Sequence, residues 1–197
     1  MNQQLLEFFT TLDRSFFIDS PYKEFSYLDA PLPIGYGQTI SQQSLVLSMT
    51  DRLKLDKDCS VLEIGTGSGF QTVLLAEFSN KVFTIELIEE LSISAKKRLD
   101  HLGYANIYYR IGDGSEGWPE MAPFDRIILT AAPTRMPNDI IDQLNFGGIM
   151  ILPVGPHGNQ QLKLISKDMQ GSISEKFLTY VAFVDMKGKY CEKDSFV

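Results

Sequence analysis

Histidine, cysteine and tryptophan are scarce in this chain of 197 residues, which contains two His, two Cys and one Trp. The two cysteines, Cys59 and Cys191, are too few for a disulfide framework or for a zinc site built from thiolates alone. With only His101 and His157, a His-based catalytic triad or a His-rich metal site is disfavoured. We therefore expect no metal site, and a chemistry that does not depend on a thiolate or an imidazole.

Basic residues and long apolar runs are also in short supply. Eighteen Lys and Arg stand against 25 Asp and Glu, a formal net charge of −7, whereas a protein that tracks nucleic acid needs a dense basic face. The longest apolar run, residues 147–154, falls well short of the roughly 20 residues that a membrane span needs. Residues 1–10 lack the basic region and cleavage site of a signal peptide. We expect a cytoplasmic monomer with reduced thiols that binds neither nucleic acid nor membranes.

The length and the apolar content fit one ordinary domain. Apolar residues make up 44% of the chain, which is enough for a real core, and 197 residues leave no room for a second domain of normal size. We predict a single domain over residues 1–197. Within it, residues 1–55 form an N-terminal cap and lid, and residues 56–197 form a sheet domain.

The predicted cap contains two helices and an irregular stretch. Residues 2–12 have the apolar spacing of a short amphipathic helix. Residues 18–40 contain several Pro and Gly, which predict irregular structure. A second helix is expected to run to about Leu53, with Ser41 as its candidate N-cap.

From Cys59 onward, strand-length apolar runs alternate with helical stretches. The predicted strands cover residues 59–64, 81–86, 106–111, 124–130, 147–154, 160–166 and 175–185. The predicted helices between them cover residues 70–78, 87–102 and 137–145. This alternation is typical of βαβ units and of a parallel sheet covered on both faces. Because only a turn separates the last two strands, they should pair as a hairpin, with one strand antiparallel to the rest. The pattern predicts an α/β fold with a seven-stranded, mostly parallel sheet.

A glycine loop, Gly65-Thr66-Gly67-Ser68-Gly69, lies between the first predicted strand and the helix after it. Glycines there allow the backbone to approach a ligand closely, and the N–H groups of the helix face the site. Glu86 ends the next predicted strand, where an acidic side chain can accept both hydroxyls of a ribose. A Rossmann dehydrogenase would need a further glycine where Phe70 stands. The observed G-x-G-x-G spacing, with Glu63 two positions before it, instead resembles the S-adenosylmethionine (SAM) motif of class I methyltransferases.

Gly112-Asp113-Gly114 follows the third predicted strand. An Asp at that position can accept a hydrogen bond from an adenine amino group, although Asp-Gly on its own is a common turn. The adenine role is favoured because this loop, the glycine loop and Glu86 fall at the same edge of the predicted sheet.

Longer segments resemble the protein-L-isoaspartate (D-aspartate) O-methyltransferase family. The most specific is DAPLPIGYGQTISQ (29–42), and VLEIGTGSGFQT (61–72), GDGSEGWPEMAPFDRIILTAA (112–132) and QLNFGGIMILPVG (143–155) also match. The resemblance implies a class I SAM-dependent methyltransferase with a Rossmann-like fold. It further implies methyl transfer from SAM to the α-carboxylate of L-isoaspartyl residues, and of D-aspartyl residues through their side-chain carboxylate. The other product is S-adenosylhomocysteine (SAH), and the methyl ester cyclises to a succinimide in the repair of damaged proteins.

The implied reaction agrees with the shortage of His and Cys. A carboxylate has a pKa of roughly 3.5–4, so it is ionised at neutral pH and is its own nucleophile. The enzyme must align that carboxylate with the methyl group and exclude water. The resemblance implies that Ser41 is the catalytic residue, its hydroxyl donating to the carboxylate. The N-cap role of Ser41 remains the alternative.

The resemblance also implies two sets of binding residues. The cofactor set comprises Thr39, Ile40, Ser41, Glu63, Gly65, Thr66, Gly67, Glu86, Asp113 and Gly114. The substrate set, which would act largely through backbone groups, comprises Ile34, Gly35, Ala132, Pro133, Val154 and Gly155. The small side chains of Ala131 and Ala132 would leave room for the kinked backbone of an isoaspartyl residue. Ordinary helix–strand packing explains their size equally well.

Position 43 and the segment 183–186 depart from the family pattern. Gln43 stands where bacterial members often have Pro or Ala, and residues 183–186 read FVDM where FVPL is usual. Three other functions remain open: a carboxyl methyltransferase with a dedicated peptide or small-molecule substrate, a metal-dependent small-molecule O-methyltransferase, and a SAM-binding protein without activity. The metal-dependent enzyme would need an acidic cluster to hold its metal, and residues 129–133 offer none.

Overall fold

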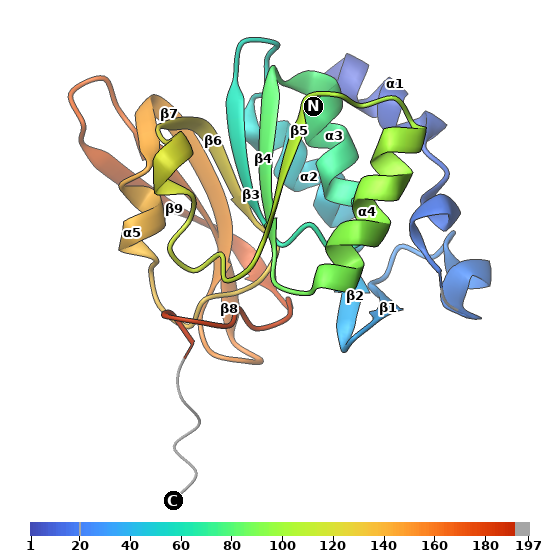
Figure 1. Cartoon of the computed structure of the whole chain (residues 1–197). Coiled ribbons are helices and arrows are strands. Elements are labelled where there is room, and N and C mark those ends of the chain that lie inside the picture. The colour runs from blue at the N-terminus through green and yellow to red at the C-terminus, as the bar shows by residue number, and fades with distance from the viewer. Residues whose placement is uncertain (20, 192–197) are drawn as a thin grey trace, which may run out of the picture.

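Seven strands form the central sheet of the computed structural model, which describes residues 1–19 and 21–191 (Figure 1). They are β3 (Ser60–Ile64), β4 (Lys81–Glu86), β5 (Ile107–Ile111), β6 (Phe124–Leu129), β7 (Leu144–Val154), β8 (Gln160–Lys167) and β9 (Ile173–Val181). Their order in the sheet is β5-β4-β3-β6-β7-β8-β9. The strands from β5 to β7 are parallel, and β8 is antiparallel to both β7 and β9. The predicted α/β fold, with a mostly parallel seven-stranded sheet and one antiparallel strand, is confirmed.

Helices cover both faces of this sheet. They are α1 (Gln3–Thr11), α2 (Gln43–Leu53), α3 (Phe70–Phe78), α4 (Glu89–His101) and α5 (Asn138–Ile141), with short 3₁₀ turns η1 (Arg14–Phe17), η2 (Pro21–Phe25) and η3 (Pro119–Met121). Figure 1 shows α2, α3 and α4 on one side of the sheet and α5 on the other. Side chains alternate along β3 accordingly: Val61 packs with Leu75 of α3, whereas Leu62 belongs to the core that contains Ile140 of α5.

The prediction that residues 18–40 are irregular was wrong for their second half. Strands β1 (Leu32–Gly35) and β2 (Gln38–Ile40) pair there as an antiparallel hairpin. Gly35, Tyr36 and Gly37 all have positive φ angles, so the glycines that suggested a break in fact form the turn.

Two predicted boundaries also change near the C-terminus. The helix predicted over residues 137–145 is only the short α5, because β7 already begins at Leu144. The last strand was predicted to reach residue 185 but ends at Val181. The chain then turns beside the loop after β6, where Asp185 forms a parallel bridge with Ala132. The predicted domain over 1–197 includes residues 20 and 192–197, which lie outside the described residues.

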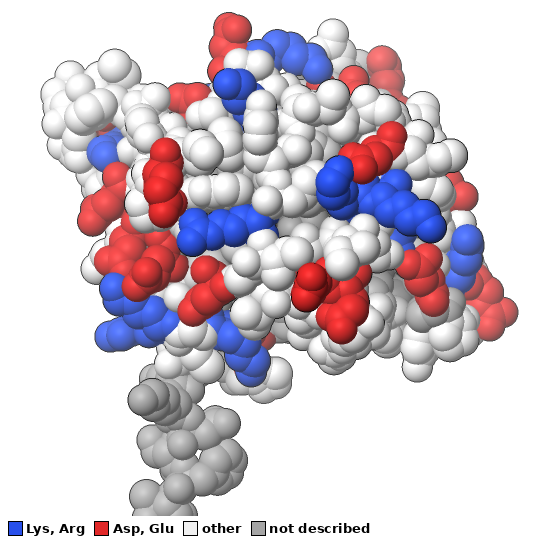
Figure 2. All heavy atoms as spheres, viewed as in Figure 1, with Lys and Arg blue, Asp and Glu red and all other residues white. Residues whose placement is uncertain are grey.

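The distribution of surface charge and the length of the helices relate to the sequence predictions about nucleic acid and membranes. On the face shown in Figure 2, basic and acidic residues are interspersed. Among residues 1–19 and 21–191, no helix is long and apolar enough to cross a membrane.

Candidate active site

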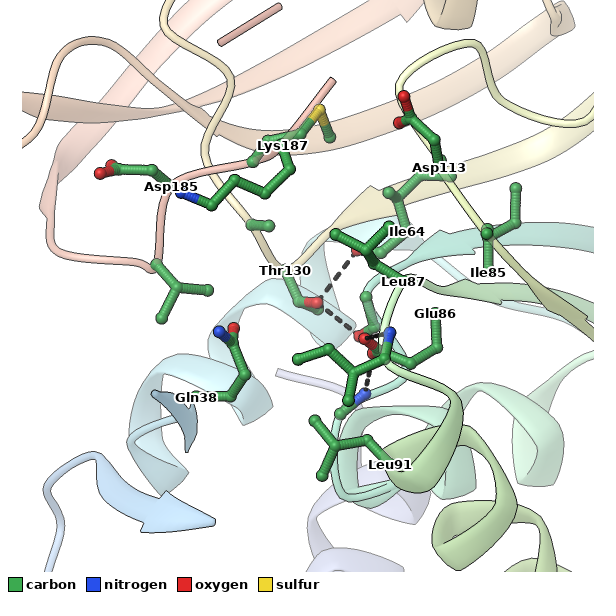
Figure 3. Close-up of a pocket in the computed structure, with 18 of the residues that line it drawn as sticks. Gln38, Ile64, Ile85, Glu86, Leu87, Leu91, Asp113, Thr130, Asp185 and Lys187 are labelled. Atoms are coloured by element: carbon green, nitrogen blue, oxygen red, sulfur yellow. Dashed lines mark hydrogen bonds between the residues drawn. The ribbon is translucent and has the colours of Figure 1, made fainter. Parts of the chain in front are cut away.

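A cavity lies where the carboxyl ends of β3, β4, β5 and β6 meet. Ligands of open α/β sheets bind at this edge of the sheet. Figure 3 shows Glu86, Asp113 and Thr130 around the cavity. Gln38 of β2 and the C-terminal residues Asp185 and Lys187 complete the wall from other parts of the chain.

The glycine loop forms the floor of this cavity. Gly65 and Gly67 both line it, with φ angles of 98° and 55°, in the region that favours glycine. A Cβ atom on Gly65 would lie 2.3 Å from Thr130 Oγ1, so only glycine allows this approach. Thr130 Oγ1 donates to the carbonyl oxygen of Gly65 at 2.6 Å, which fastens the loop to the end of β6 (Figure 3).

Glu86 presents its carboxylate to the cavity from the end of β4. Its Oε2 accepts a hydrogen bond from Gly67 N at 2.8 Å, and its Oε1 accepts one from Ile88 N at 3.0 Å. Glu86 is only 6% exposed, and the two hydrogen bonds hold its carboxylate in one orientation. A carboxylate has about four acceptor positions, which leaves two for a ligand. This arrangement suits the ribose role predicted from the sequence.

Asp113 and Gly114 line the same cavity from the loop after β5. Asp113 Oδ1 accepts a hydrogen bond from Ser115 N at 2.8 Å, which orients the carboxylate. A Cβ on Gly114 would lie 2.7 Å from Ile64 Cγ2, so this glycine lets the loop pack on β3. Of the predicted cofactor residues, the structure brings Thr39, Gly65, Gly67, Glu86, Asp113 and Gly114 to one cavity.

Glu63 is in a different place, because it lies beneath the glycine loop and is 0% exposed. Its Oε2 accepts hydrogen bonds from the hydroxyls of Thr72 and Thr84, each at 2.7 Å. Thr84 Oγ1 is in turn 2.6 Å from Thr66 Oγ1. Burial raises the pKa of Glu63 from 4.5 to about 8, and the nearby Glu86 adds to that rise. Glu63 therefore supports the loop from below and does not face the cavity.

This buried carboxyl group predicts a loss of stability as the pH rises. Because its pKa is higher in the folded chain than in the unfolded one, the stability that it contributes is complete below about pH 4.5 and is lost toward pH 8. Glu63→Gln should lack this loss, since the amide does not ionise. Between about pH 5 and about pH 8, the melting temperature should fall less in Glu63→Gln than in the control Glu90→Gln, which changes an exposed residue. An equal fall in melting temperature over this pH range in the two variants would contradict the prediction.

A larger groove adjoins the cavity and shares Thr39, Thr130 and Val184 with it. The residues that line the groove are all uncharged: Pro31, Thr39, Ser41, Gln42, Ser44, Leu45, Ser48, Thr130, Thr179, Tyr180, Val181, Ala182, Phe183 and Val184. A small cavity between Ser41 and Gly67 is also lined by Ile40 and Thr66, which places the remaining predicted cofactor residues other than Glu63 next to the cavity and the groove.

Ser41 lines this groove and does not cap α2. The helix begins at Gln43, with Gln42 as its N-cap residue. The capping bond comes from Asp29, whose Oδ1 accepts a hydrogen bond from Ser44 N at 2.9 Å. The N-cap alternative for Ser41 was therefore wrong, and capping does not engage its hydroxyl.

The residues predicted to bind substrate line neither the cavity nor the groove. Ala132 is buried, and its N–H and C=O groups are bonded to Val184 O and Met186 N, each at 2.8 Å. Gly155 N donates to Pro133 O at 3.0 Å, so these backbone groups are also engaged. Val154, the last residue of β7, is buried in the core, while Ile34 and Gly35 belong to the β1–β2 hairpin. The groove residues of β9 and α2 were missed, since no motif marks them in the sequence.

Solved structures share this architecture. A protein-L-isoaspartate O-methyltransferase superimposes with a TM-score of 0.86 and 26% identity, over 96% of this chain and 63% of that chain. A structure from Plasmodium falciparum, described as a putative protein-L-isoaspartate O-methyltransferase in complex with SAH, superimposes with a TM-score of 0.82 and 24% identity, over 94% and 91% of the two chains. The fold, with a glycine loop that lines a cavity at the carboxyl edge of the sheet, is that of the SAM-dependent methyltransferases.

The sequence as a whole narrows this class to one family. The model of the protein-L-isoaspartate (D-aspartate) O-methyltransferase family matches residues 1–190, and this chain belongs to that family. The protein-L-isoaspartate O-methyltransferase of Dictyoglomus turgidum is 47% identical over 193 residues, which are 98% of this chain and 87% of the relative. A second relative of that name, from Syntrophobacter fumaroxidans, is also 47% identical, over 95% of this chain and 76% of its own length.

Proposed function

We propose that this protein transfers a methyl group from SAM to the α-carboxylate of L-isoaspartyl residues, and of D-aspartyl residues through their side-chain carboxylate. Family membership supports the reaction class. The observation that carries the proposal is the junction at Thr39 and Thr130, where the cavity at the carboxyl edge of the sheet adjoins a larger uncharged groove. A polypeptide in the groove would present a carboxylate to a cofactor in the cavity.

The residues around the cavity fit the cofactor. Glu86 has two acceptor positions free for the ribose hydroxyls, and Asp113 stands where an adenine amino group can donate to it. Gly65, which has no side chain, lines the cavity together with Thr130 and Thr39. When bound, SAM supplies a methyl group on a positively charged sulfur, which is already activated for transfer.

This chain then has to orient the substrate rather than activate it. The carboxylate is its own nucleophile because its pKa is roughly 3.5–4. The half-buried Ser41 at the junction can donate its hydroxyl hydrogen to one carboxylate oxygen and leave the other directed at the cavity. An uncharged groove suits substrates that share an abnormal linkage but differ in their flanking residues. The methyl ester then cyclises to a succinimide without the enzyme, and hydrolysis returns part of it to a normal aspartyl linkage.

Methyl incorporation into a matched pair of peptides tests the function. The two peptides have the same sequence and differ only in an isoaspartyl or a normal aspartyl linkage. We expect methylation of the isoaspartyl peptide alone. Equal methylation of both would favour a carboxyl methyltransferase with another dedicated substrate, and methylation of neither would contradict the proposal.

Ser41→Ala should lower turnover without weakening cofactor binding. A hydrogen bond to a charged group contributes about 1.5–3 kcal/mol, so kcat should fall by roughly 10- to 100-fold. The Kd for SAH should change far less than kcat, because Ser41 does not line the cavity around Glu86 and Asp113. Ser174→Ala, the same change at an exposed position of β9, serves as the control. Wild-type turnover in Ser41→Ala would remove the catalytic role from this residue.

A further inference from the structure

Arg14 is buried outside the cavity and the groove, and its side chain grips the backbone of the segment that leads to the site. It is 4% exposed. Its Nη1 donates to Ser26 O at 3.2 Å and to Leu28 O at 2.8 Å. Its Nη2 donates to Ala30 O at 2.7 Å and to Ser41 O at 3.0 Å. The four terminal N–H groups of the guanidinium thus meet four carbonyl oxygens.

Two of these carbonyls lie at the base of the β1–β2 hairpin. Ala30 precedes β1, and Ser41 follows β2 (Figure 1). By holding both, Arg14 Nη2 joins the two ends of the hairpin, whose second strand supplies Gln38 and Thr39 to the cavity. The position of Arg14 therefore determines where the hairpin and Ser41 stand relative to the glycine loop.

Gln43 holds the same segment from the other side. Its Nε2 donates to Ser26 O at 3.2 Å and to Leu28 O at 3.4 Å, the two carbonyls that Arg14 Nη1 also contacts. Gln43 is the first residue of α2, and Asp29 of this segment caps the same helix through Ser44 N. Residues 26–30 are thus tied both to Arg14 and to the first turn of α2. The departure from the family pattern at position 43 adds an amide donor here.

We propose that Arg14 is a positioning residue for methyl transfer, assisted by Gln43, which sets the base of the β1–β2 hairpin and so aligns Ser41 with the cofactor cavity. This inference rests on the proposed function. The planar fork of an arginine suits the task, since a lysine presents a single ammonium with three donors to four carbonyls. A misplacement of about 1 Å at a reacting group can cost on the order of 100-fold in rate.

The test compares Arg14→Met, Arg14→Lys and Arg14→Ala with Arg52→Met, a control at an exposed position of α2. In Arg14→Met, kcat for an isoaspartyl peptide should fall by roughly 10- to 100-fold. The Kd for SAH should change far less, because the hairpin supplies only Gln38 and Thr39 to the cavity, whereas Glu86, Asp113 and the glycine loop do not depend on Arg14. Arg14→Lys should lie between Arg14→Met and the wild type. Millimolar guanidinium should restore part of the kcat of Arg14→Ala, where the side chain leaves room for it, but none of the kcat of Ser41→Ala.

Gln43→Ala extends the test to the second donor. Alone it should lower kcat less than Arg14→Met does, because Arg14 still holds both carbonyls. In the double variant the two effects should not add, since the two side chains share their acceptors. Additive effects would overturn the assisting role of Gln43.

The outcomes separate positioning from folding. Wild-type kcat in a folded Arg14→Met overturns the proposal. So does a parallel loss of kcat and SAH binding in all Arg14 variants without guanidinium rescue, which identifies a purely structural residue. If the wild-type protein methylates no isoaspartyl peptide, the proposed function fails first, and this inference fails with it.

Discussion

Replacing Glu86 by Gln should weaken SAH binding by at least about 100-fold, because two hydrogen bonds to a charged acceptor contribute about 1.5–3 kcal/mol each. The substitution also disturbs the site before any ligand binds. Both carboxylate oxygens accept backbone N–H groups, from Gly67 and from Ile88. An amide group would set its own N–H₂ donor against one of these two donors.

Calorimetric titration with SAH measures this effect directly. Glu89→Gln is the matched control, since Glu89 lies in the first turn of α4, is exposed and does not line the cavity. The thermal unfolding of both variants should be recorded, because Glu86 also orders the glycine loop. A wild-type Kd in Glu86→Gln would show that the carboxylate does not hold the cofactor.

The sheet could be predicted from the sequence because its signals are local. Apolar runs of strand length, bounded by Gly and Pro, mark β3 to β8 to within a few residues. The helix expected over residues 70–78 is α3 with the same bounds. The glycine loop and Glu86 were also recognisable, because a strand–loop–helix unit fixes which residues stand at the edge of a parallel sheet.

The groove could not be predicted, because it arises from contacts between distant segments. Thr179 and Phe183 lie beside Ser41 only because β8 and β9 extend the sheet past β7, which α2 contacts. The expected substrate residues Ala132 and Gly155 lie at the carboxyl ends of strands, but their backbone groups pair with other parts of the chain. Motif position alone does not reveal such pairing.

Glu63 is a case in which a signal was present. Side chains alternate along a strand, so Glu63 lies on the same face of β3 as Val61, which packs against α3. An acidic residue on that face would be buried under the helix rather than exposed to a ligand. The hydroxyls of Thr72 on α3 and Thr84 on β4 supply the partners that such a position requires.

Gly65→Ala should destabilise the protein by about 2–5 kcal/mol, through backbone strain and overpacking together. The φ angle of Gly65 is 98°, which L side chains rarely adopt, and the new Cβ would lie 2.3 Å from Thr130 Oγ1. Because Gly65 lines the cavity, relief of this clash must move the loop, and SAH binding should be lost as well. Thermal unfolding and SAH titration measure the two effects.

Two companion variants separate the causes of that loss. Gly103 has a φ angle of 87° with open space around its Cβ position, so Gly103→Ala measures the strain without the clash. Thr130→Ala removes the oxygen at 2.3 Å and leaves its own Cβ at 3.6 Å, an ordinary contact. The double variant Gly65→Ala/Thr130→Ala should therefore be more stable than the sum of its single changes predicts. Strict additivity would assign the loss to strain alone, whereas wild-type stability and SAH affinity in Gly65→Ala would show that the loop tolerates a side chain. The close approach of the loop to β6 would then not be what shapes the cofactor cavity.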